Sequence, residues 1–377
     1  MNKQRLLSKF LWLLIFTGSM LLASCKKDEA PLLAPEMQMS VENSKISLNF
    51  EETLLLEAAP LNNADYQQEW KVDGQVQSTA SSLEFKSSQA GTYEIVYRAF
   101  NSVGIFETVY TILVKAKDTP VTEESSMYVT TLFEFLPAPG QFINKSLGDL
   151  ASAESILGKR GMVSLGAWGG YVVLGFDHTV KNREGDDIMV YGNASAIFSE
   201  PGIIYVMQDE NGNGQPDDTW YEIAGSDFGK EGYIRDYEVT YSRPTAAKAD
   251  IPWKDNRGNT GVIARNNFHV QDHYYPEWVK EDEYTLKGTH LSGGNIDMSN
   301  PRFITSLPLE FGYADNKVGG DMIDLSNAVD KDGKKISLSG IDFIKIQTGI
   351  QANMGWLGEL STEVEAVADL SLVPITQ

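Results

Sequence analysis

Short strand-like segments separated by glycine and Asn-Gly turns recur along this chain, and long helical periodicity is nearly absent. Only residues 148–159 have a pattern that predicts a helix. Many short strands without strand–helix alternation are typical of a sandwich or jelly roll. The sequence therefore predicts an all-β chain, with strands in the C-terminal two thirds at residues 128–135, 171–176, 187–191, 202–207, 220–224, 237–242, 284–290, 341–348 and 362–373.

The first predicted domain covers residues 41–117, where strand-like runs are short and closely spaced. Residues 90–99 form the clearest strand, because Tyr93, Ile95 and Tyr97 point to one face and the charged Glu94 and Arg98 to the other. Asp73-Gly74 is a typical hairpin turn. Roughly seven strands in so short a segment fit an immunoglobulin-like sandwich.

Three features of this domain resemble a PKD-type domain. Trp70 lies on a middle strand, residues 90–93 (Ala-Gly-Thr-Tyr) open a later strand, and Asn101 and Gly104 lie in a turn. The aspartate-rich segment expected after the tryptophan is reduced to Asp73 and its glycine. The resemblance implies a spacer or interaction module, with Trp70 and Tyr93 in its core.

A chain of 377 residues exceeds the usual ~100–200 residues of one domain. Residues 118–126 lack an apolar pattern and are predicted to be a linker, followed by a larger domain at 127–377. The order of strand-like segments in this second domain resembles that of galactose-binding-like jelly rolls. The region also resembles Bacteroidetes surface lipoproteins that are joined to PKD-like domains and found with outer-membrane nutrient transporters, including cobamide systems.

The first 25 residues resemble a lipoprotein leader. Basic residues precede a mostly apolar run that is shorter than a membrane span, and residues 22–25 (Leu-Ala-Ser-Cys) look like a lipobox. This predicts a signal peptide at 1–24, an acylated Cys25 and a flexible tether at 25–40. Residues 26–29 (Lys-Lys-Asp-Glu) resemble a surface-export signal, so we expect lipid anchoring in the outer membrane, facing the cell exterior.

Charge and cysteine content exclude several classes of function. The net charge of −21 repels phosphate backbones, so nucleic acid is not an expected partner. One cysteine allows neither a disulfide framework nor a cysteine-based zinc site. The expected partners are the membrane, a TonB-dependent-type transporter, and a small-molecule or glycan ligand.

Residues 209–218 (Asp-Glu-Asn-Gly-Asn-Gly-Gln-Pro-Asp-Asp) form the sharpest local motif. Oxygen-bearing side chains at alternate positions, with a glycine at the sixth, resemble part of an EF-hand loop. Trp220 stands where that loop has its bidentate glutamate. Two interpretations remain open: a plain turn between two strands, or a Ca²⁺ site whose ligands come from Asp209, Asn211, Asn213, Gln215, Asp217 and Asp218.

Four aromatic residues, Trp253, Tyr274, Tyr275 and Trp278, are candidates for ligand binding. Aromatic side chains in loops at the rim of a sandwich can stack on sugars or flat ligands, or else cover the ends of the core. Both interpretations remain open for these four residues. Trp168 and Trp356 are expected to pack in the core.

The sequence contains no G-x-S-x-G elbow, phosphate-binding loop or H-E-x-x-H motif. We therefore expect a non-catalytic surface lipoprotein that binds a nutrient, a cobamide or a glycan, for an outer-membrane transporter. Two alternatives stay open. One is a glycan-active hydrolase or lyase, because 52 acidic residues always offer carboxylate pairs. The other is an adhesin that binds a host or matrix protein.

Overall fold

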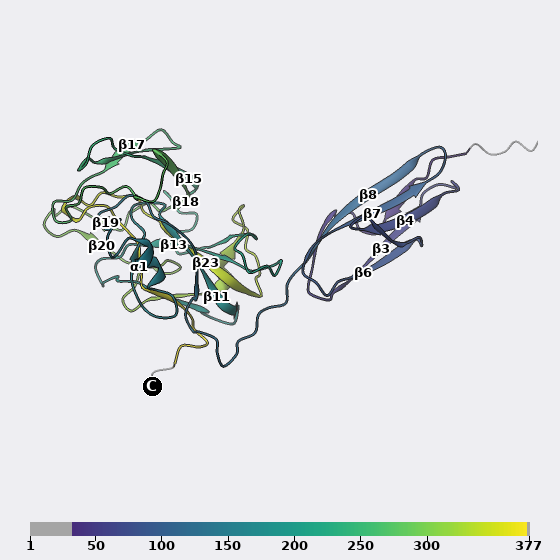
Figure 1. The fold of residues 1–377 in the computed structure, drawn as a ribbon, viewed down its shortest axis with the longest axis horizontal. Helices are drawn as coiled ribbons and strands as arrows, with labels where there is room; N and C mark the ends of the chain where they lie inside the picture. Colours follow the sequence, from purple (N-terminus) through teal and green to yellow (C-terminus); the bar gives the residue numbers. More distant parts are fainter. Residues whose placement is uncertain (1–31, 375–377) are drawn as a thin grey trace, which may run out of the picture. The chain divides into compact units, whose positions relative to one another are not determined.

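The computed structural model describes residues 32–374, and almost all of its regular structure is β-strand (Figure 1). The described residues contain one short α-helix, α1 (Leu150–Glu154), and two 3-10 turns, η1 (Leu325–Asn327) and η2 (Gly355–Leu357). The predicted all-β class is therefore confirmed. No helix in the described part of the chain is both long and apolar enough to span a membrane.

Two sheets contain the strands before residue 115. The first has the order β1-β3-β6, formed by Met37–Met39, Thr53–Pro60 and Ser82–Lys86. The second has the order β2-β8-β7-β4-β5, formed by Lys45–Leu48, Ile105–Val114, Gly91–Phe100, Gln67–Val72 and Gln75–Ser78. Strand β2 runs parallel to β8, whereas β4 is antiparallel to β5 and β7. Eight short strands in two sheets constitute an immunoglobulin-like arrangement.

Alternation along β7 explains the packing of the five-stranded sheet. Ile95, Tyr97 and Ala99 are buried, whereas the residues between them are not. Trp70 of β4 is also fully buried, and its ring centroid lies 4.6 Å from that of Tyr97. The prediction that Trp70 belongs to the core is confirmed, while Tyr93 is only half-buried.

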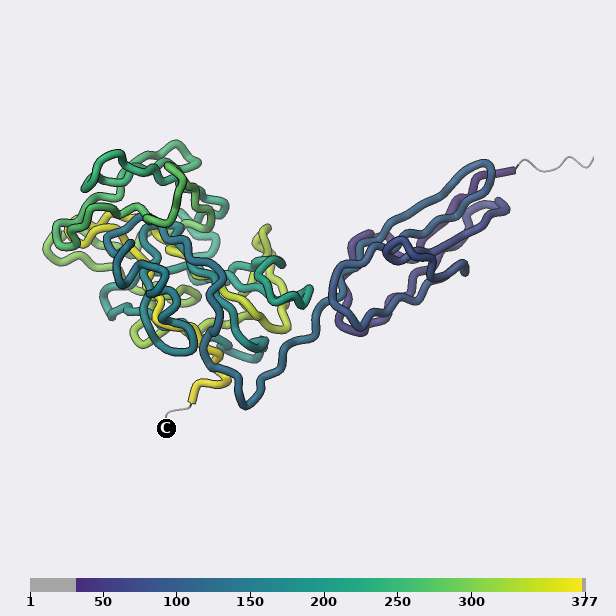
Figure 2. The backbone as a smooth tube through the Cα atoms, in the orientation of Figure 1, coloured from purple at the N-terminus to yellow at the C-terminus, as the bar shows by residue number. Residues whose placement is uncertain are grey.

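A six-stranded sheet forms the centre of the region after residue 127. Its order is β22-β14-β13-β23-β11-β9, formed by Ala328–Val329, Tyr221–Ile223, Gly202–Met207, Gly340–Thr348, Tyr171–Lys181 and Thr131–Leu136. A three-stranded sheet has the order β21-β12-β25, formed by Asp321–Ile323, Ile188–Tyr191 and Ala366–Asp369. Figure 2 shows how early and late backbone segments interleave here, as in the antiparallel pairing of β11 with β23.

The main hydrophobic core includes side chains from both of these sheets. Its members include Val172, Leu174, Ile204, Val206, Ile344 and Ile346 from the six-stranded sheet, and Ile188, Val190, Ile323 and Val367 from the three-stranded sheet. The region is therefore a β-sandwich. Nearly every residue of β11 and β23 is buried, which explains why these strands read as apolar runs.

A four-stranded sheet contributes to a second, aromatic core. Its order is β17-β16-β15-β18, formed by Thr260–Ile263, Ile251–Asp255, Ile234–Ser242 and Glu283–His290. Tyr237, Tyr241 and Leu286 from this sheet pack in one cluster with the fully buried Trp168. Two short pairs complete the sheets: β10 (Val163–Ser164) with β24 (Glu363–Val364), and β19 (Ile296–Asp297) with β20 (Thr305–Ser306).

The helix predicted at residues 148–159 is much shorter in the structure. Asp149 caps α1 by accepting a hydrogen bond from the backbone of Ser152, whose hydroxyl in turn accepts one from Asp149. The helix ends at Glu154, and Gly158 has the positive φ angle typical of a chain leaving a helix. A five-residue helix suffices because Ala153 alone inserts into the main core.

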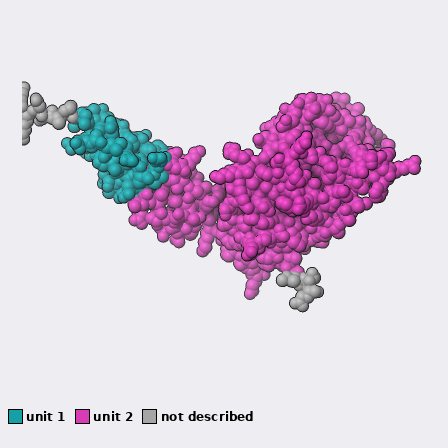
Figure 3. Space-filling model, turned by 180° about the vertical axis from the view of Figure 1, so that it is seen from behind, with its two compact units in different colours: residues 1–42, 56–83, 95–109 teal, residues 43–55, 84–94, 110–377 magenta. Residues whose placement is uncertain are grey.

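The chain divides into two compact units, shown in Figure 3. One comprises residues 1–42, 56–83 and 95–109, and the other comprises residues 43–55, 84–94 and 110–377. This division passes through β3, β6, β7 and β8. The boundaries at 41–117, 118–126 and 127–377 therefore stay predictions.

Candidate functional site

A cavity of about 370 Å³ is lined by several acidic side chains. We call it the acidic pocket. Its wall is partly apolar, with Phe142, Leu147 and Phe198. Three glutamates complete the wall beside serine and amide side chains: Glu200, Glu359 and Glu363.

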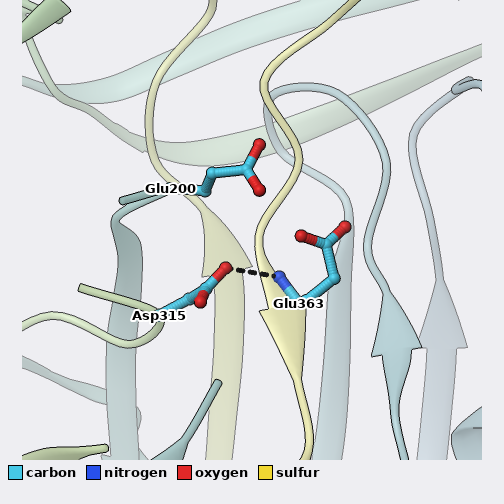
Figure 4. Close-up of side chains that lie close together, drawn as sticks. All are labelled: Glu200, Asp315 and Glu363. Carbon is cyan, nitrogen blue, oxygen red and sulfur yellow. Dashed lines mark hydrogen bonds between the residues drawn. The ribbon is translucent and has the colours of Figure 1, made fainter. Parts of the chain in front are cut away.

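Backbone hydrogen bonds bring the acidic side chains together from distant parts of the sequence (Figure 4). Asp315 connects the segments: its Oδ2 accepts from the backbone N–H of Glu363 at 2.9 Å, and its Oδ1 accepts from that of Asn193 at 2.9 Å. The N–H of Glu200, just before β13, donates to the carbonyl of Asp315 at 2.9 Å. Asp315 has φ +50°, a left-handed conformation that aspartate tolerates better than most residues.

One carboxylate oxygen from each of Glu200, Asp315 and Glu363 lies within 4.8 Å of the others. Figure 4 shows the carboxylates of Glu200 and Glu363 directed toward the same space. Ser361 fixes both: its backbone N–H donates to Glu200 at 3.0 Å, and its hydroxyl donates to Glu363 at 3.0 Å.

Burial raises the pKa of all three carboxyl groups, and repulsion from neighbouring carboxylates adds to the effect at Glu200 and Asp315. For Glu200 and Asp315 burial is the largest cause, followed by the negative charge of Glu363, and each pKa is held well above its usual range. Burial also raises the pKa of Glu363. No lysine or arginine lines the acidic pocket among the described residues, so protein cations do not neutralise the cluster.

Glu359 adds a fourth carboxyl group to the acidic pocket. Its side chain is only 4% exposed, and its Oε1 accepts a hydrogen bond from the backbone N–H of Gln141 at 2.6 Å. Its other oxygen, Oε2, is buried and has no hydrogen-bond partner. Burial raises the pKa of Glu359 to about 8. A buried, unpaired carboxyl oxygen in a pocket is a position that a ligand or a proton can satisfy.

The four predicted ligand-binding aromatics do not form an open site. Tyr274 and Tyr275 are each 1% exposed and belong to the aromatic core, and Trp253 packs against that core from strand β16 rather than a loop. The rings of Tyr274 and Tyr275 therefore lack a free face for stacking, and the core interpretation describes these two, whereas Trp253 is half-buried. Trp278 is 36% exposed and lies 5.9 Å from the ring of Phe135.

Trp168 and Trp356 were both expected in the core, and only one of them lies there. Trp168 is fully buried, as expected, and its ring lies 4.7 Å from that of Tyr237. The expectation that Trp356 packs in the core was wrong, because its side chain is 50% exposed. It follows Met354 and Gly355 in a turn, where its indole N–H donates to the carbonyl of Pro301.

The predicted calcium loop joins β13 to β14, which pair in antiparallel register, as both interpretations of the motif require. Asp209 accepts hydrogen bonds from the backbone N–H groups of Gly212, Asn213 and Gly214. Asp217 accepts from the amide side chains of Asn211 and Asn213. These bonds hold the loop in its turn, and a bound Ca²⁺ stays a prediction.

The residues of the acidic pocket were not singled out from sequence. Glu200 and Asp315 are more than a hundred residues apart, and Glu363 comes later still. The 52 acidic residues of the chain also offer many candidate pairs. The sequence around Asp315 carries no strong local signal, because polar residues and glycines surround it. Cys25, the predicted lipidation site, lies outside the described residues.

No family model and no curated protein matches the sequence. Among solved structures, the chain is similar to fibronectin(III)-like modules of CbhA from Clostridium thermocellum, with 20% identity over 21% of this chain and 96% of that chain, and a TM-score of 0.18. It is also similar to a quinonprotein alcohol dehydrogenase-like protein from Bacteroides thetaiotaomicron, with 11% identity over 89% of this chain and 99% of that chain, and a TM-score of 0.21. At TM-scores this low the likeness is slight, and the strand order of this chain defines its fold.

Proposed function

We propose that this chain is a non-catalytic surface lipoprotein that binds a nutrient ligand in the acidic pocket. The observation that carries the proposal is a cavity of about 370 Å³ in which Glu359 keeps one carboxyl oxygen unpaired. Cavities of this size lie at the lower end of the range for small-molecule sites. The pocket therefore suits a sugar unit of a glycan, or one projecting group of a larger ligand such as a cobamide.

The chemistry of the lining favours a hydroxyl-rich ligand. A carboxyl group accepts hydrogen bonds and, when protonated, also donates one, and a sugar hydroxyl can both donate and accept. Phe142 and Phe198 supply apolar surface beside Glu200 and Glu359, as a sugar ring with one apolar face requires. Of the two ligand classes expected from sequence, a glycan fits this lining better.

The proposed location rests on the sequence of the leader. The lipobox ending at Cys25 and the charged tether after it support lipid anchoring in the outer membrane, with the chain facing the exterior. A TonB-dependent-type transporter is the proposed recipient of the ligand. Mass spectrometry of the native protein should find acylated Cys25, and protease treatment of intact cells should degrade the protein. An unmodified cysteine, or full protection from protease, would contradict this location.

The binding proposal is tested by titrating the purified full chain with glycans and cyanocobalamin in a calorimeter. We expect at least one ligand to bind, and Glu359→Gln to weaken that binding at least tenfold, because an amide NH₂ group cannot reproduce a carboxyl oxygen that accepts hydrogen bonds and also carries the proton. Glu184→Gln is the matched control, since Glu184 is exposed and does not line the acidic pocket. Ligand binding that is equal in both variants would remove the acidic pocket from the proposal.

A second candidate function, a glycan-active hydrolase or lyase, is favoured by one observation. The raised pKa of Glu359, about 8, keeps this carboxyl protonated at neutral pH beside other carboxyls, as a general acid requires. Incubation with polysaccharides, followed by measurement of reducing ends or unsaturated products, distinguishes the two functions. Turnover that Glu359→Gln abolishes while binding persists would establish the enzyme and overturn the non-catalytic proposal.

A further inference from the structure

The cluster formed by Glu200, Asp315 and Glu363 has the ligand chemistry of a cation site. The three side chains come from separate segments, and backbone or serine donors fix each one in place. Asp315 is fully buried and Glu363 is 4% exposed. Negative groups in so dry an environment need a proton or a bound cation to neutralise them, because burying unpaired charge is costly.

We infer that Glu200, Asp315 and Glu363 bind one Ca²⁺ ion, which forms part of the ligand-binding surface of the acidic pocket. This inference rests on the proposed function only in placing the ion within the same cavity. It adds a metal site distinct from the loop at residues 209–218. The ion would contribute positive charge where no lysine or arginine of the described lining does so.

A second observation points independently to a ligand in this cavity. Glu359 also lines the acidic pocket, its side chain is more than nine-tenths buried, and its Oε2 has no partner. Its pKa is raised mainly by burial, with a smaller contribution from the charge of Glu363. A cation bound to Glu363 would offset that repulsion, and water on the cation could donate to the unpaired oxygen.

The geometry favours Ca²⁺ over smaller ions. Ca²⁺ binds oxygens at 2.3–2.6 Å, so ligands on opposite sides of the ion lie about 4.6–5.2 Å apart. The three oxygens here lie within 4.8 Å of one another, without any movement of the side chains. Mg²⁺ demands a near-ideal octahedron at about 2.1 Å and keeps several of its waters, so proteins usually hold it with one or two carboxylates rather than three. Zn²⁺ prefers nitrogen and sulfur ligands, and this cluster offers oxygen alone.

Three carboxylates leave the coordination sphere of Ca²⁺ incomplete, because the ion takes six to eight oxygens. Glu200 and Glu363 line the acidic pocket, so water or two hydroxyls of a sugar in the pocket could occupy the free positions. The inference therefore predicts that ligand binding strengthens when Ca²⁺ is present. It also predicts that Ca²⁺ binding releases protons, since the carboxyl groups must ionise to coordinate the metal.

Calorimetric titration of the chelator-stripped full chain with CaCl₂ alone tests the metal site. We expect Ca²⁺ binding by the wild type, and at least a tenfold loss of affinity or loss of one binding site in Glu200→Gln and Glu363→Gln. Asp217→Asn, which alters the predicted calcium loop, is the matched control and should keep this site. Near-UV circular dichroism establishes that each variant is folded, and the half-buried Glu200 provides the variant least prone to misfolding.

Three outcomes would overturn the inference: no Ca²⁺ binding, binding that only Asp217→Asn removes, or unchanged binding in folded Glu200→Gln and Glu363→Gln. Titration with glycans in the presence of a chelator keeps the two ideas separate. Ligand binding without any Ca²⁺ binding would leave the proposed function intact and refute the metal site. Ca²⁺ binding without any ligand would support the metal site and contradict the nutrient-binding proposal.

Discussion

Replacing Glu359 with glutamine should change how the stability of this protein depends on pH. The side chain is 4% exposed, and burial raises its pKa from 4.5 to about 8. Between these two values the folded state keeps the proton, whereas the unfolded state loses it. The unfolded state therefore binds fewer protons, and the free energy of unfolding falls as pH rises through this interval.

The magnitude follows from the two pKa values of Glu359. One pH unit of difference in proton affinity corresponds to about 1.4 kcal/mol. The interval from 4.5 to about 8 therefore represents on the order of 5 kcal/mol of stability, present at pH 4.5 and lost by pH 8. Glu359→Gln removes this titration. Its amide leaves one donor without a partner, which costs about 1–3 kcal/mol at every pH and does not alter the slope.

Urea denaturation of the full chain in a metal chelator, between pH 5 and pH 9, measures the effect. Wild type should lose stability steeply with rising pH, and Glu359→Gln should lose several kcal/mol less over the same range. Glu184→Gln, at an exposed position, should follow the wild-type profile. Parallel profiles for wild type and Glu359→Gln would refute the reasoning, because burial would then not control the charge of this carboxyl.

Three further predictions concern the core. His178→Asn should cost about 3 kcal/mol near pH 6, because it leaves the buried Asp369 carboxylate without the imidazole that lies 3.0 Å away. The hydrogen bond with Asp369 raises the pKa of His178, so this contribution is complete below about pH 6.5 and declines as pH rises, which urea denaturation at pH 6 and pH 9 checks. Gly170→Ala should lower stability by about 3 kcal/mol or more, since the new methyl carbon would lie 1.8 Å from the carbonyl oxygen of Leu165; thermal denaturation measures the loss. Trp70→Ala should cost about 3–5 kcal/mol in the first sandwich, and loss of protection from hydrogen exchange in β4 and β7 reports it.

Strands with strong alternation or a continuous apolar run could be predicted from sequence. The strand predicted at residues 202–207 has the same bounds as β13, and the strand predicted at 341–348 begins one residue earlier as β23. Both lie in the middle of the six-stranded sheet, where burial demands apolar residues at nearly every position. The apolar run of each strand is therefore enough to predict it from the sequence.

Strands β16 and β17 were missed because their sequences carry weak or contrary signals. Pro252 argues against a strand, yet it lies outside the residues of β16 that pair with β15. The positions of Tyr274 and Tyr275 could not be predicted from the sequence either. Tyrosine clusters occur both at binding surfaces and in cores, and only the tertiary structure shows that the hydroxyl groups of this pair are satisfied by the backbone carbonyls of His269 and Glu281.

The acidic pocket could not be predicted because its residues meet only through the sandwich topology. Asp315 accepts hydrogen bonds from residues 122 positions before it and 48 positions after it. Nothing in local periodicity encodes such a contact. A chain that needed only stability would place apolar residues at these positions, since buried charges usually cost more than they return. Keeping Glu200, Glu359 and Glu363 in one cavity, beside the buried Asp315 and with one oxygen unpaired, is the kind of local conflict that folded proteins tolerate where they bind something.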